Sequence, residues 1–204
     1  MYSVDVMKAE HDNILEFLKV VRSMCCQVVA GGDLVTDDFR QVVDFARNYS
    51  DAQHHGKEEH FLFNEMEARL GPVGVNLIRH GMLVEHNLCR GHMFDLTTAL
   101  DQYEADPDIQ TKVDIVEAAN GYATLLTRHI AKENTVVYPF GEKNLGAEVI
   151  AQIDDKVRAF EAQTAEVPDR YLAMLEQLRD RYGRVDDRHQ DVVITPTAPK
   201  VQID

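Results

Sequence analysis

The stretch HIAKENTVVYP, residues 129–139, places His129 four residues before Glu133 within an apolar run. On an α-helix, residues four apart lie on one face, with their Cβ atoms about 5–6 Å apart. Both side chains can therefore reach one point, or two adjacent points, in space. The stretch predicts a helix that carries metal ligands.

A second copy of this module lies earlier in the chain, in HHGKEEHFLF, residues 54–63. In the first copy, an aliphatic and an aromatic residue follow the glutamate at the fourth and fifth positions. The same offsets hold from Glu58 but not from Glu59. The repeat therefore selects His54 with Glu58 over His55 with Glu59. One such pair alone would be read as an intrahelical ion pair on a solvated face, but two copies with matched flanks favour a shared site.

Apolar residues recur at three- and four-residue steps over four segments of the chain. They predict helices over residues 5–29, 36–70, 72–103 and 109–137, with a turn at 71–74 and with Pro139 closing the last helix. Short connections make neighbouring helices antiparallel. We therefore expect an all-α fold, an antiparallel up-down-up-down four-helix bundle over residues 1–142.

The rest of the chain is more polar. Residues 146–164 and 167–182 predict two additional C-terminal helices, which form an extension over residues 143–183 and lie against the bundle. Residues 184–204 contain two prolines, Pro196 and Pro199, and we expect an extended or partly ordered tail.

The composition argues against several classes of function. The 204-residue chain has a net charge of −14 and no basic cluster, so a nucleic-acid or anionic-membrane surface is not expected. Residues 1–6 have neither a basic region nor an apolar signal core, and no window approaches the roughly 18 apolar residues that span a bilayer. Three cysteines form a poor disulfide framework and suit a reducing compartment. We expect a soluble, cytoplasmic protein.

Lone histidines on the first and third predicted helices complete a set of candidate metal ligands. Facing side chains at the centre of a four-helix bundle are where such proteins build cofactor sites. Six ligands are too many for a four-coordinate structural zinc, and they suit two metal ions that share carboxylates. Imidazoles with hard oxygen ligands fit iron best, with manganese or zinc as weaker alternatives. The predicted ligands are His11, His54, Glu58, His86, His129 and Glu133.

This pattern resembles the hemerythrin-like family, whose bundles carry the HHE cation-binding signature. The family's order is a lone His, then His-x-x-x-Glu, then a lone His, then His-x-x-x-Glu, and residues 5–140 meet it. The Glu58-Glu59 doublet, the Glu85-His86-x-x-x-Arg90 segment and the Tyr-Pro ending at residues 138–139 are similar to the family's usual surroundings of these ligands. The resemblance implies two oxo- or hydroxo-bridged iron ions, with histidines as terminal ligands and glutamates as bridges.

The chain departs from the oxygen-carrying hemerythrins on the third helix. Those proteins place two histidines four residues apart there, whereas Met82 stands four residues before His86. His80 is the alternative ligand, and we favour His86 because Glu85 and Arg90 accompany it. With fewer histidines, a larger share of the metal ligands are oxygen atoms. Such a site suits chemistry on dioxygen, peroxide or nitric oxide better than reversible carriage of dioxygen.

Several other residues near the predicted ligands receive weaker assignments. His55 either supports the ligands from beside the ligand position or is an alternative ligand. Tyr122, seven residues before His129, either caps the metal pocket or is a core aromatic residue, and the latter is favoured. The remaining candidates are interpreted as surface residues or as residues that support the ligands: Glu59, His60, His92 and His189.

The leading hypothesis is a hemerythrin-like non-heme di-iron protein that binds or senses dioxygen or a related small ligand. One alternative is a di-iron enzyme that acts on peroxide or nitric oxide, or an iron donor. The other is a metal-free helical interaction module. The expected partners are a small diatomic ligand or peroxide, with a homo-oligomer through the C-terminal extension as a further expectation.

Overall fold

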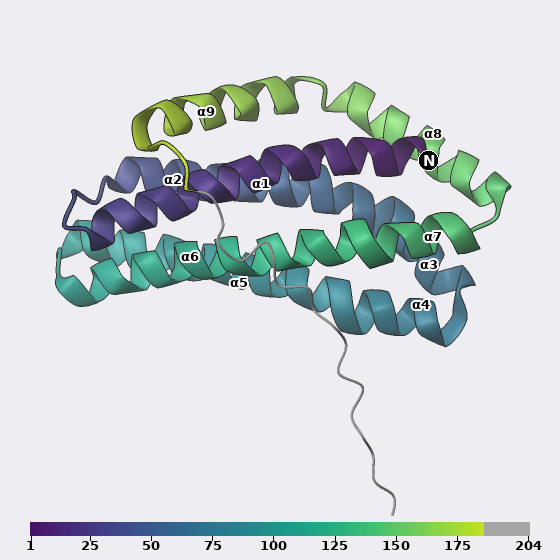
Figure 1. Ribbon diagram of the computed structural model, residues 1–204, viewed down its shortest axis with the longest axis horizontal. Coiled ribbons are helices and arrows are strands. Elements are labelled where there is room, and N and C mark those ends of the chain that lie inside the picture. The colour runs from purple at the N-terminus through teal and green to yellow at the C-terminus, as the bar shows by residue number, and fades with distance from the viewer. Residues whose placement is uncertain (186–204) are drawn as a thin grey trace, which may run out of the picture.

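The computed structural model describes residues 1–185, and within them every regular element is helical (Figure 1). The first rod of the bundle is α1 (Tyr2–Val29). The second rod contains α2 (Thr36–Phe45), η1 (Ala46–His55), η2 (Glu58–Phe63) and α3 (Asn64–Arg69), where η marks a π-helical segment. The third contains α4 (Gly71–Leu77), η3 (Ile78–Met82) and α5 (Leu83–Ala105). The fourth contains α6 (Ile109–Lys132), η4 (Glu133–Val137) and α7 (Tyr138–Asn144).

The four rods form the expected bundle. In Figure 1, α1 and α2 lie above α5 and α6. Helix α6 contacts both α1 and α5, and α5 in turn contacts α2. The predicted all-α, up-down-up-down four-helix bundle is thus confirmed.

Two predicted boundaries are wrong. Pro139 does not close the fourth helix, because the rod continues from η4 directly into α7. Pro139 lies in the first turn of α7, where the hydrogen bonds change from the π-helical to the α-helical pattern. The turn expected at residues 71–74 is shorter and is centred on Leu70, with α4 already begun at Gly71. Gly71 adopts φ +61°, which lets the chain reverse in so few residues.

The residues after the bundle form α8 (Ala147–Gln163) and α9 (Glu166–Tyr182), close to the predicted ranges. These helices run in series along the bundle beside α1 (Figure 1). Asp154 of α8 accepts hydrogen bonds from the backbone N–H groups of Tyr2, at 3.2 Å, and Ser3, at 2.9 Å. The C-terminal extension therefore supplies acceptors for backbone N–H groups in the first turn of α1, which have no partner within the helix. The tail expected over residues 184–204 lies outside the described residues beyond Val185.

The bundle interior contains two apolar clusters. The larger includes Ile14, Phe17, Phe45 and Leu126, and the smaller includes Met7 and residues of α3, η3, η4 and α8. Along α1, His11 lies between Met7 of the smaller cluster and Ile14 of the larger one. Buried polar residues therefore separate two dry regions of the core. Within residues 1–185, no helix is both long and apolar enough to cross a membrane.

Candidate metal centre

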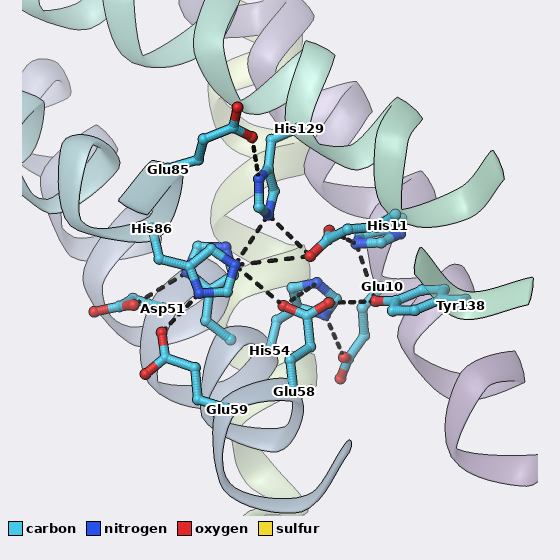
Figure 2. Close-up of polar contacts among 12 residues, drawn as sticks. Glu10, His11, Asp51, His54, Glu58, Glu59, Glu85, His86, His129 and Tyr138 are labelled. Atoms are coloured by element: carbon cyan, nitrogen blue, oxygen red, sulfur yellow. Dashed lines mark hydrogen bonds and ion pairs between the residues drawn. The ribbon is translucent and has the colours of Figure 1, made fainter. Parts of the chain in front are cut away.

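Seven buried side chains converge between the two apolar clusters. Figure 2 shows the site and labels His11, His54, Glu58, His86 and His129 among them. Six of them are the predicted ligands, and each is at most 1% exposed. The seventh is His55, which the repeat had set aside in favour of His54 and which is 2% exposed. All four rods contribute: His11 from α1, His54 and His55 from η1, Glu58 from η2, His86 from α5, His129 from α6 and Glu133 from η4.

The side chains form two adjacent groups, each able to hold a metal ion. In the first, ligand atoms of His55, Glu58, His86 and His129 all lie within 4.8 Å of one another. The Nε2 atoms of His86 and His129 are 2.9 Å apart, and Oε1 of Glu133 is 2.9 Å from Nε2 of His129. The first position is therefore faced by three imidazoles and two carboxylates.

The second group contains His11, His54, Glu58 and Glu133, whose ligand atoms also lie within 4.8 Å of one another. Oε2 of Glu133 is 3.2 Å from Nε2 of His11. Oε2 of Glu58 is 3.7 Å from Nε2 of His54 and 3.5 Å from Nε2 of His86. Both carboxylates thus face both positions, and the second position has one imidazole fewer.

Unpaired polar atoms show that these residues fit metal ions. Nε2 of His54, Nε2 of His55, Oε2 of Glu58 and both carboxylate oxygens of Glu133 are buried without a hydrogen-bond partner in the described part of the chain. Such atoms are costly unless something binds them. Two ligand atoms each about 2.0–2.1 Å from one ion are about 2.9–3.4 Å apart, which is close to several of the separations here.

The electrostatics also favour an added positive charge. Burial raises the pKa of Glu58 well above its usual range, and the charge of Glu133 adds to the shift. Burial likewise opposes ionisation of Glu133, but the charge of His129 and the close approach of the His11 ring outweigh it and hold the pKa of Glu133 well below the usual range. One carboxyl of the pair is therefore protonated, and a bound cation would let both ionise.

A π-helical segment explains how His54 and His55 both enter the site. On an α-helix, adjacent residues diverge by about 100°, so the sequence predicted that only one of them faces inward. In η1 the hydrogen bonds span five residues, so each turn holds more residues and adjacent side chains diverge less. Glu58 and Glu133 begin two further π-helical segments. The histidine doublet itself was the only sequence signal for the additional ligand.

Each imidazole is oriented through its Nδ1 atom. In four cases the partner is a carboxylate: Glu10 for His54 at 2.9 Å, Asp51 for His55 at 3.1 Å, Glu59 for His86 at 2.6 Å and Glu85 for His129 at 2.8 Å. The Nδ1 atom of His11 instead meets the amide oxygen of Asn134 at 2.9 Å. These contacts leave Nε2 of each ring free to face a metal ion. Sequence reasoning identified only Glu59 among them as a surface residue or a residue that supports the ligands. It used Glu85 as a neighbour that favours His86 and did not connect it with His129.

Basic side chains neutralise the supporting carboxylates. Arg90 donates to Asp51 and, at 2.8 Å, to Glu59, so one guanidinium supports two histidines. Lys132 contacts Glu85, and the fully buried Lys57 contacts Glu10. Burial raises the pKa of Glu10 to about 7, although Lys57 partly opposes the shift.

The tyrosine nearest the site is Tyr138 rather than Tyr122. Its hydroxyl donates to Oε1 of Glu58 at 2.5 Å and lies 3.4 Å from Nε2 of His11, on whose ring it stacks. Tyr122 lies in the larger apolar cluster, as the favoured interpretation expected. Tyr138 was visible in the sequence only as part of the Tyr-Pro ending.

The other histidines lie away from the centre. His80, the alternative third-helix ligand, is exposed, whereas His86 is buried in the cluster. His60 is exposed, and His92 is half-buried against Gly121. His189 lies outside the described residues.

A helical bundle whose facing rods bring imidazoles and carboxylates to one buried point belongs to the class of bundle metalloproteins. A family model described as the hemerythrin HHE cation binding domain matches residues 2–141. The chain therefore belongs to the hemerythrin family, and the predicted resemblance is confirmed. No curated protein and no solved structure matches the chain.

Proposed function

We propose that this protein is a non-heme di-iron protein that binds or senses dioxygen or a related small ligand. The observation that carries the proposal is the pair of adjacent ligand groups joined by Glu58 and Glu133. When bound, the two irons supply the site at which the small ligand attaches and the electrons that it takes up. His55, His86 and His129 would hold one ion, and His11 and His54 the other.

The two positions differ in a way that suits ligand binding. The second position has two imidazoles where the first has three, so it has fewer protein ligands to fill its coordination sphere. The hydroxyl of Tyr138 lies beside this position, on Glu58 and His11. The ring stacked on His11 limits the movement of that imidazole. Apolar clusters flank the site on either side and limit its contact with water.

His55, the fifth imidazole of the site, changes which function is better supported, reversible binding of a small ligand or its chemical turnover. The sequence predicted four histidines and an oxygen-rich site, which favoured chemistry over reversible binding. With His55 in the cluster, imidazoles outnumber carboxylates five to two. Reversible binding is therefore the better-supported function.

The test is metal analysis with a spectrum recorded under changing gas. Protein produced with added iron should contain two irons per chain and show charge-transfer absorption that changes reversibly when dioxygen is removed and restored. Glu133→Ala should lose iron and absorption, while Glu117→Ala, an exposed glutamate on α6, should retain both. Zinc alone, no metal, or a spectrum indifferent to dioxygen would contradict the proposal.

Turnover of peroxide is the second candidate, and Tyr138 is the observation that favours it. A buried phenol hydrogen-bonded to Glu58 can hold or deliver a proton at the second position. Burial raises the pKa of Tyr138 well above its usual range, so the hydroxyl keeps its proton. Steady-state decomposition of hydrogen peroxide by iron-loaded protein, reduced in Tyr138→Phe at equal iron content, would favour the enzyme over the carrier.

A further inference from the structure

A cavity of about 280 Å³ lies beside the metal centre and is not used by the function proposed above. It is lined by Ala46, Arg47, Asp51, His55, Cys89, Arg90, Met93 and Tyr122. Arg47 is exposed and Arg90 is partly exposed, so the cavity opens to solvent, while His55 and Tyr122 are buried.

His55 is the only member of the metal cluster in the cavity wall. Its ring stacks on that of His86 with the centroids 3.8 Å apart, and His86 does not line the cavity. A molecule in the cavity would therefore lie one imidazole ring away from the first metal position. It would also contact Asp51, which orients that ring.

The inner wall is largely apolar but offers an unused hydrogen-bonding group. Ala46, Cys89 and Met93 are each at most 4% exposed and present apolar surface. The hydroxyl of Tyr122 is buried beside that of Ser50, and neither hydroxyl forms a hydrogen bond of good geometry in residues 1–185. A buried hydroxyl without a partner is costly, and a ligand oxygen would remove that cost.

The mouth of the cavity carries an uncompensated positive charge. Arg90 is already paired with Asp51 and Glu59. Arg47 donates to Thr97 at 3.1 Å and forms no ion pair with a carboxylate in the described part of the chain. In a protein with a net charge of −14, an unpaired guanidinium at the mouth of a cavity favours an anionic ligand.

We propose that this cavity binds a small organic acid. The apolar body of the acid contacts Ala46, Cys89 and Met93, and its oxygens meet the donors that Arg47 and Tyr122 leave unused. An apolar cavity of about 150 Å³ is large enough for benzene, so this one has room for a substituted ring of that size. The proposed binding of an acid depends only on the cavity. An effect of the bound acid on a metal ion through His55 rests on the function proposed above.

Benzoate is the probe, titrated into the purified full-length protein by calorimetry. Benzyl alcohol, which has a similar shape and no charge, is the comparison ligand. Wild-type protein should bind one benzoate, and benzyl alcohol more weakly. Arg47→Gln should weaken benzoate about tenfold and Tyr122→Phe about fivefold, the sizes expected for a charged and a neutral hydrogen bond. Arg69→Gln and Tyr103→Phe, on residues outside the cavity, should bind as the wild type does.

Metal content and melting temperature are measured on the same samples, so that a misfolded variant is recognised. No saturable binding of benzoate to folded wild-type protein would overturn the proposal. Equal binding of benzoate and benzyl alcohol, with no effect of Arg47→Gln, would overturn the assignment to an acid. Benzoate binding in a protein that takes up no metal would support the cavity site and contradict the proposed di-iron function.

Discussion

Lys57 is the least expected residue of the interior. Its side chain is fully buried, and its ammonium group contacts Glu10, which in turn accepts from His54. A lysine without a partner would not remain buried and charged, so Glu10 stabilises the buried ammonium group of Lys57. The ammonium group in turn stabilises the buried carboxylate of Glu10. In sequence, the lysine of HHGKEE has the appearance of a solvated residue on the outer face of a helix.

Replacing Lys57 with methionine should therefore destabilise the protein. The variant leaves the carboxyl of Glu10 buried without its cation, and loss of one partner of a buried pair costs on the order of 3 kcal/mol. The free energy of unfolding, from urea denaturation at about pH 8, above the Glu10 pKa of about 7, measures the change.

Two companion variants make this result interpretable. Lys156→Met removes a half-exposed lysine that pairs with Glu65 at 3.6 Å and should change stability by no more than about 0.5 kcal/mol. The double variant Glu10→Gln/Lys57→Met should recover much of the lost stability, because no buried charge is left unpaired. Equal stability of Lys57→Met and wild type would mean that the pair does not form.

His55 provides a second prediction at the scale of one residue. If it is a ligand, His55→Ala should weaken binding at the first position by at least about tenfold, the lower end of what loss of even a supporting residue costs. Iron retained after dialysis against a chelator is the measurement. His60→Ala, on an exposed histidine five residues along the chain, is the matched control. If the two variants retained equal amounts of iron, His55 would be a residue that packs in the core and does not bind the metal.

The helical elements show what sequence periodicity can and cannot predict. Apolar steps such as Ile14, Phe17, Leu18 and Val21 fix which face of α1 is buried, so the four rods and their antiparallel order could be predicted. The same reasoning treats each rod as a uniform α-helix. It therefore missed the π-helical segments, and with them the inward turn of His55 and the continuation of the helix beyond Pro139.

Hydrogen-bond partners that lie on different rods could not be predicted from the sequence either. Glu10 and His54 are 44 residues apart, and the Tyr138 hydroxyl meets Glu58 across 80 residues. A repeated His-x-x-x-Glu spacing identifies residues that share one helix face, because that relation is local. The carboxylate that orients each imidazole depends on how two rods are rotated against each other, and spacing along one rod carries no information about that.

Helix α8 has a definite role in positioning α1. Asp154 accepts two backbone N–H groups of the first turn of α1 and the Ser3 hydroxyl. Asp154→Ala should cost about 1–2 kcal/mol of unfolding free energy, as loss of an N-terminal cap does. Urea denaturation measures this, with Asp155→Ala, an exposed neighbour, as the control. If the two variants have the same free energy of unfolding, the extension does not stabilise α1.

At the scale of the whole molecule, the ligands connect all four rods. Each position draws side chains from three rods, and the apolar clusters on either side hold the rods in register. Binding of metal ions to the folded protein alone would add to the stability of the bundle as a unit. The effect should depend on pH, because an imidazole must be neutral to bind a metal ion.

His129 gives the direction of this dependence. Burial opposes its protonation, but Glu133 and Glu85 outweigh that effect and raise its pKa to about 9, against roughly 6.5 in an unfolded chain. Because the folded-state pKa is the higher one, the stabilisation that the charged imidazole gives the metal-free fold is complete below about pH 6.5 and is lost as the pH rises through 9. Metal binding displaces the same proton, and also the proton that the raised pKa of Glu58 keeps on the carboxyl pair, so metal affinity changes in the opposite direction. It should rise by at least about tenfold per pH unit up to pH 9 and fall in acid.

We therefore expect the melting temperatures of the metal-bound and metal-free proteins to diverge as the pH is raised from about 7 to 9 and to converge towards about pH 5, where the metal is released. Thermal melts with and without Zn²⁺, together with chelator competition at each pH, measure both effects. Glu85→Gln should flatten the dependence, because it removes one of the charges that raise the His129 pKa. A metal affinity that stayed constant over this range would show that no protonated imidazole has to be displaced, and would count against His129 as a ligand.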